Sequence, residues 1–129
     1  MSIRKWATLA VVLSLFGLGV NSSQAHHSTA MFDSTKKVML QGTVKKWSFT
    51  NPHSWLYVVV TDAQGVETVW ELEGGSTSHM ARNGWTYKSL KSGDKITVSI
   101  SPRVDGQPGG SFSSVTLSDG TVLSSSPAV

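Results

Sequence analysis

The stretch VMLQGTVKKWSF, residues 38–49, decides the fold that we expect for this chain. From Val38 to Val44 an apolar residue or glycine stands at every second position, which is the period of a half-buried β-strand. The alternation fails at Lys45-Lys46, and Trp47 and Phe49 resume it in the opposite phase. A β-bulge at the two lysines would explain this change and would bend the strand. The stretch therefore predicts a long, bent first strand.

Further strands and one short helix follow this strand. Asn51-Pro52 ends it, because proline cannot donate a hydrogen bond to a neighbouring strand. The later strands are rich in β-branched or alternating apolar residues and are bounded by turn residues: Ser54–Thr61, Glu67–Glu73, Lys95–Ser101, Ser111–Leu117 and a short return strand at Thr121–Leu123. Between the third and fourth strands, Ser76 or Thr77 can cap a helix that runs to about Asn83, with Gly84 as its left-handed stop.

This order of elements predicts an all-β fold with one short helix. Three strands, a helix and two further strands, with a bent first strand, are the order found in the OB-fold, a five-stranded Greek-key barrel. An SH3-like barrel or a small β-sandwich is the alternative that the pattern leaves open.

The beginning of the chain is typical of a secretory signal peptide. Arg4 and Lys5 precede an apolar run from Trp6 to Val20, and Ser23 and Ala25 provide the small side chains that a cleavage site requires. The apolar run is shorter than the roughly 20 residues that span a bilayer. We therefore expect export to the bacterial periplasm, cleavage after Ala25, and no stable membrane insertion afterwards.

Four segments result from these predictions. They are a signal peptide at residues 1–25, an N-terminal arm at 26–37, the barrel at 38–123 and a loose C-terminal tail at 124–129. Arg4 and Lys5 leave with the signal peptide, so the net charge falls from +3 to +1. Nucleic-acid binding, which requires a clustered basic patch, is not expected. The chain has no cysteine, so its fold depends on the core without disulfides.

The predicted mature N-terminus offers a candidate copper site. Cleavage before His26 gives one residue a free α-amine and an imidazole, and His27 adds a backbone amide or a second ring. Nitrogen donors in a tetragonal plane suit Cu(II). A cut one residue earlier leaves Ala25-His26-His27, which is another strong Cu(II) arrangement. The alternative without a metal is that both histidines are ordinary polar residues of an exposed arm.

His53 is the third candidate metal ligand. It lies in the loop between the first two predicted strands, which borders the ligand face of OB-folds. The arm is long enough to fold back to it. A structural role, in which His53 hydrogen-bonds a carbonyl and fixes a turn, fits the sequence equally well. For His79, on the short helix, we expect a solvated or capping role.

The same loop and strand provide an alternative function without metal. Asn51, His53, Trp55 and Tyr57 would present a polar and aromatic face of the barrel to a small ligand or to another protein of the envelope. The other tryptophans are expected in the core or at the ends of the barrel. The sequence therefore predicts a small binding module.

We do not expect an enzyme. The chain has neither a nucleophile-elbow serine nor an HExxH helix. Glu71 and Glu73 share one face of a predicted strand and could act as paired carboxylates, but exposed glutamates on strands are far more common.

Several short motifs resemble one known family. They are His26-His27-Ser28, Phe32-Asp33, Leu40-Gln41-Gly42-Thr43-Val44, Asn51-Pro52-His53-Ser54-Trp55, Trp70-Glu71, Gly84-Trp85 and Ser89-Leu90-Lys91-Ser92-Gly93-Asp94. Together they resemble a family of short exported bacterial proteins classed as a domain of unknown function, from His26 to about Gly120. The resemblance implies export but no activity. Ser92 replaces the proline of many members, and His79 is not part of the family pattern.

Overall fold

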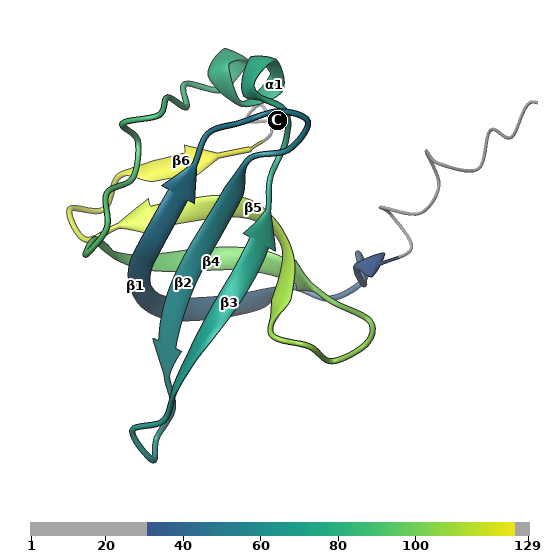
Figure 1. The fold of residues 1–129 in the computed structure, drawn as a ribbon, viewed down its shortest axis with the longest axis vertical. Helices are drawn as coiled ribbons and strands as arrows, with labels where there is room; N and C mark the ends of the chain where they lie inside the picture. Colours follow the sequence, from purple (N-terminus) through teal and green to yellow (C-terminus); the bar gives the residue numbers. More distant parts are fainter. Residues whose placement is uncertain (1–30, 126–129) are drawn as a thin grey trace, which may run out of the picture.

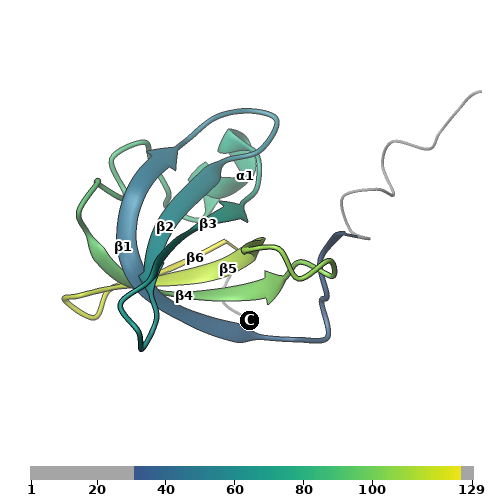
Figure 2. The ribbon, with the colours of Figure 1, turned by 60° about the horizontal axis from the view of Figure 1, so that its bottom comes forward.

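The first strand, β1 (Val38–Ser48), takes part in both halves of the sheet. In the computed structural model, which describes residues 31–125, β1 pairs with β4 (Lys95–Pro102) over Val38–Thr43 and with β2 (Trp55–Thr61) over Thr43–Ser48. The register with β2 shifts between Val44 and Lys46, so the predicted bulge is confirmed. Figure 2 shows how strongly β1 curves as it passes from one half of the sheet to the other.

The remaining strands close a barrel (Figure 1). Next to β2 lies β3 (Glu67–Glu73), and β5 (Gly109–Leu117) pairs with β4 on one side and, in parallel, with β3 on the other. The ring therefore runs β1–β2–β3–β5–β4 and returns to β1. With α1 (Thr77–Arg82) between β3 and β4, this is the topology of the OB-fold. The predicted all-β, OB-like barrel is confirmed.

A glycine in β1 permits the tight curvature. The Cα of Gly42 lies so close to β2 that an added Cβ would overlap the carbonyl oxygen of Val59 and the side chain of Val58. Because both obstacles belong to a paired strand, any side chain at position 42 would push β1 and β2 apart.

One end of the barrel is closed by α1 and the residues after it. Ser76 caps the helix by accepting a hydrogen bond from the backbone N–H of His79, as the sequence predicts. Two side chains of this segment, Met80 and Trp85, are buried in the core. The centroid of the Trp85 ring lies 5.2 Å from that of Trp47 and 5.6 Å from that of Phe112. The end of the barrel is therefore closed by aromatic packing.

The barrel extends further along the chain than predicted. Strand β6 (Val122–Ser124) pairs with β5, and the backbone N–H of Ser125 donates to the carbonyl of Ser113 at 2.8 Å. The Trp85 indole N–H also donates to the carbonyl of Ser124 at 2.8 Å. The prediction of a loose tail from residue 124 is therefore wrong for Ser124 and Ser125, because backbone pairing holds both. Residues 126–129 lie outside the described part.

The predictions for residues 1–30 also fall outside the described residues. These are the signal peptide, its cleavage site and the two histidines at positions 26 and 27. Within residues 31–125, no helix has the length and apolar character needed to cross a membrane.

Candidate functional site

The loop between β1 and β2 is fixed to the helix by Asn51. The Asn51 side-chain oxygen accepts hydrogen bonds from the backbone N–H of Thr77 at 2.9 Å and from the Thr77 hydroxyl at 3.0 Å. The Asn51–Pro52 peptide is cis. The side-chain oxygen of Asn51 is thus bonded to the first turn of α1, so Asn51 positions the loop that presents His53.

His53 is held from one side of its ring. Its Nδ1 lies 3.2 Å from the carbonyl oxygen of Gly74 and 3.2 Å from Oε1 of Glu73. Both partners accept, so Nδ1 is the protonated nitrogen of the neutral ring. Among residues 31–125, Nε2 has no hydrogen-bond partner, and 43% of the side chain is exposed. Glu73 and Gly74 therefore orient the imidazole and leave Nε2 as a free acceptor or metal ligand.

The described end of the N-terminal arm lies beside this loop. Phe32 forms a β-bridge with Arg103, the N–H of Asp33 donates to the carbonyl of Pro102 at 2.8 Å, and Val104 donates to the carbonyl of Met31 at 2.9 Å. Phe32 also lines, together with His53, a cavity of about 430 Å³. The sequence predicts an unpatterned arm, but from Met31 to Asp33 the arm is bonded to the barrel, and it approaches His53.

A second cleft lies on the outer face of β2 and β3. Because Leu56, Val58 and Leu72 point into the core, their neighbours along each strand point outward. The cleft has a volume of about 320 Å³, and the residues that define its chemistry are Phe32, Trp55, Glu71, Glu73, Arg103 and Pro108. It shares Phe32 and Glu73 with the His53 cavity. The two hollows are therefore adjacent.

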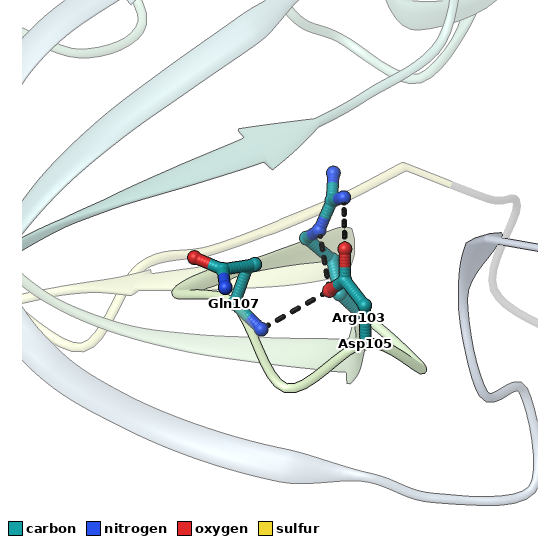
Figure 3. Close-up of polar contacts among 3 residues, drawn as sticks. All are labelled: Arg103, Asp105 and Gln107. Carbon is teal, nitrogen blue, oxygen red and sulfur yellow. Dashed lines mark hydrogen bonds and ion pairs between the residues drawn. The ribbon is translucent and has the colours of Figure 1, made fainter.

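The loop between β4 and β5 forms one wall of this cleft. Arg103 contacts Asp105 through two parallel hydrogen bonds, and Asp105 also accepts the backbone N–H of Gln107 at 3.0 Å (Figure 3). The hydrogen bonds from Arg103, and then the one from Gln107, lower the pKa of Asp105 to about 2. The same pairing raises the pKa of Arg103. Asp105 thus stays ionised and fixes the guanidinium.

The position of both hollows matches the binding surface of OB-folds. Ligands of that fold bind on the face of strands 2 and 3, between the β1–β2 and β4–β5 loops. Here the first loop provides His53 and the second provides Arg103. In Figures 1 and 2 the arm and the β4–β5 loop lie on the same side of the barrel.

The structure separates the four residues of the predicted interaction face. Trp55 lines the outer cleft and His53 lines the neighbouring cavity. Tyr57 lies on the outer face of β2, where its ring is 5.8 Å from the ammonium of Lys46. Asn51 supports the loop from behind. Of the predicted face, Trp55 and His53 therefore line the hollows, whereas Tyr57 lies on the outer face of β2 and Asn51 holds the loop in place.

His79 has a structural role. Its Nε2 lies 2.7 Å from the carbonyl oxygen of Ser125, which ties the helix to the end of the barrel. The side chain also lines the His53 cavity. Within residues 31–125 no three metal-ligating side chains form a group that could hold an ion. A metal site at His53 therefore requires ligands from outside this part of the chain.

Sequence reasoning missed Phe32, Arg103 and Asp105. Residues 102–110 read only as a glycine- and proline-rich loop, although an OB-like order of strands places this loop at the ligand face. That topology was the one signal that could have directed attention to Arg103.

Comparison with known proteins identifies one family. The model of DUF6152, a family of unknown function, matches residues 15–112. No curated protein and no solved structure matches the chain significantly.

Proposed function

The chain belongs to the DUF6152 family of unknown function, and we propose that it is an exported periplasmic module that binds Cu(II) through its mature N-terminus and His53. The observation that supports this most strongly is the state of His53. One ring nitrogen is engaged by Glu73 and Gly74, and the other is free and directed away from these partners.

This arrangement is the usual environment of a metal-bound histidine. Such residues almost always donate the second ring N–H to a carboxylate or a backbone carbonyl, which fixes the tautomer and makes the ligating nitrogen more basic. His53 has both kinds of partner on Nδ1. Nε2 would then provide one donor to the copper.

The missing ligands are close along the chain. Six peptide steps separate His26 from Phe32, and an extended chain spans about 20 Å over that distance. Phe32 already lines the cavity that contains His53. The α-amine and imidazole of His26 are therefore within reach of Nε2, and His27 can add its amide or its ring.

The ligand set favours Cu(II) over other divalent ions. An amine and two or three imidazole or amide nitrogens fit the tetragonal plane that Cu(II) prefers, and the chain has no thiolate that would favour softer ions. In this proposal the cleavage of the signal peptide creates the site, because the amine does not exist in the precursor.

A calorimetric titration tests the proposal, with glycine as a competing Cu(II) ligand. The processed protein is compared with a form that carries Gly-Ser before His26 and with His53→Ala. We expect the extended form to bind Cu(II) at least tenfold more weakly than the processed protein, because it lacks the N-terminal chelate. The variant His53→Ala keeps the chelate but loses the imidazole of the barrel, and we expect a similar weakening. Glu73→Ala should weaken binding about tenfold by freeing the His53 ring, whereas Glu67→Ala on the same strand should not.

Two outcomes decide the matter. Equal, weak binding by the processed and extended forms would rule out the N-terminal chelate. Unchanged affinity in His53→Ala, with the extended form weakened, would show an N-terminal chelate in which the barrel takes no part.

A second candidate function is an interaction module that uses the barrel face without metal. The outer cleft supports it, because Trp55 and Glu73 line a hollow of about 320 Å³ at the binding face of the fold. This function predicts that the Gly-Ser extension leaves ligand binding unchanged, whereas substitution of Trp55 weakens it.

A further inference from the structure

The outer cleft combines aromatic walls with the carboxylates of Glu71 and Glu73, neither of which forms an ion pair with a lysine or an arginine among residues 31–125. Trp55 and Glu73 are directly opposite one another on β2 and β3, and Glu71 is two residues further along the same outward face. Phe32 from the arm and Pro108 from the β4–β5 loop complete the apolar walls. The hollow is large enough for a small organic molecule.

The charges around the cleft favour a cation. Two carboxylates, Glu71 and Glu73, and one guanidinium, Arg103, line the cleft. Asp105, next to the lining, accepts hydrogen bonds from Nε and a terminal nitrogen of Arg103. The Glu71 carboxylate makes no hydrogen bond or ion pair with any residue of the described part, and it attracts Arg103 only at longer range. Within the described part, the Glu73 carboxylate has one polar side-chain partner, the imidazole of His53. The outer strand face therefore keeps an excess of negative charge.

We propose that this cleft binds a small organic cation, an ammonium group that carries an apolar body. A cation over the face of tryptophan or phenylalanine is stabilised by the ring quadrupole, and the effect grows as water is excluded. The Glu71 carboxylate adds a charge–charge attraction. An anion is disfavoured, because the guanidinium that could receive it is already paired with Asp105. The inference goes beyond copper binding and does not depend on it.

Choline and its uncharged carbon analogue, 3,3-dimethylbutan-1-ol, test the inference. The two probes have the same shape and differ in the charge of the head group. Binding is followed on metal-free, processed protein by the NMR shifts of the tryptophan indole N–H groups. We expect choline to shift the Trp55 signal with saturation in the millimolar range, and the neutral analogue to bind at least fivefold more weakly.

Variants locate the site. Glu71→Gln should weaken choline binding about fivefold, and Trp55→Leu should weaken it by a similar factor. Glu67→Gln is the matched control, because Glu67 lies on the same face of β3, outside the cleft. Thermal melts show whether each variant is folded.

The probes also give the results that would overturn the inference. Equal affinity for choline and the neutral analogue means an apolar hollow without selection for charge. No shift of the Trp55 signal by choline at 50 mM, which is about ten times the expected dissociation constant, means that the cleft is not a site for such cations. Both results concern metal-free protein, so they leave the copper titration unaffected.

Discussion

The two tryptophans Trp85 and Trp55 occupy opposite environments, the packed end of the barrel and an outward-facing cleft. Trp85 is 1% exposed, packs on Trp47 and Phe112, and donates to the carbonyl of Ser124. Trp55 lies on the opposite side of the strand layer, facing outward into a cleft with Glu73. The end closed by α1 thus holds the barrel together, while the β2–β3 face keeps aromatic and charged groups accessible. The binding functions that we propose therefore use the part of the barrel where packing is incomplete.

The largest expected effect is at the closed end. Trp85→Ala removes a buried indole and its hydrogen bond and leaves a cavity, so we expect it to lower the free energy of unfolding by about 3–5 kcal/mol. Trp55→Ala should cost less than half as much, because part of its surface is already in water. Urea denaturation of both variants measures the difference. Equal losses would contradict the division of roles.

The same contrast between a structural and a proposed binding residue can be tested within one loop, at Asn51 and His53. Asn51→Ala removes two hydrogen bonds to Thr77, and we expect a loss of about 1–2 kcal/mol in the free energy of unfolding. His53→Ala should cost less, because 43% of the His53 side chain is already exposed to water. For copper affinity we expect the opposite ranking, with a larger loss in His53→Ala than in Asn51→Ala. A larger loss of stability in His53→Ala would make His53 a structural residue.

The smallest expected effect comes from the pH dependence of the β4–β5 loop. Hydrogen bonds from Arg103 lower the pKa of folded Asp105 to about 2, from an ordinary value of 3.8. The stability that this pairing contributes is therefore present above about pH 4 and is lost as the pH falls towards 2. Asp105→Asn should reduce the fall of the melting temperature in that window. An unchanged acid profile in the variant would contradict the pairing.

The fold was largely predictable from local pattern. The phase change at Lys45-Lys46 corresponds to a bulge, and β3 begins and ends where the alternation predicts. Each signal is local, because the inward positions of a strand must be apolar whatever its partner is. The strands β4 and β5 are longer than predicted, by one residue and two residues, because Pro102 and Gly109 take part in the sheet.

The candidate site was predictable only in part. The sequence singles out His53 and Trp55 because they stand in a loop and a strand whose place in an OB-like barrel is known, and both line a hollow. Phe32 and Arg103 are about 70 residues apart, and only the bridge between the arm and the end of β4 brings them together. Such a contact depends on tertiary structure, which periodicity along the chain does not report. The role of Asn51 in holding Thr77 was missed for the same reason.

The central claim is that export creates a copper site from the new N-terminus and His53. Native mass spectrometry of the protein recovered from the periplasm of a bacterial host grown with copper tests it in one measurement. We predict a chain that begins at His26 and carries one copper ion, and a clearly lower copper occupancy of the same chain when His53 is changed to alanine. A mature chain that carries no copper, or one whose copper occupancy is unchanged in His53→Ala, would contradict the claim.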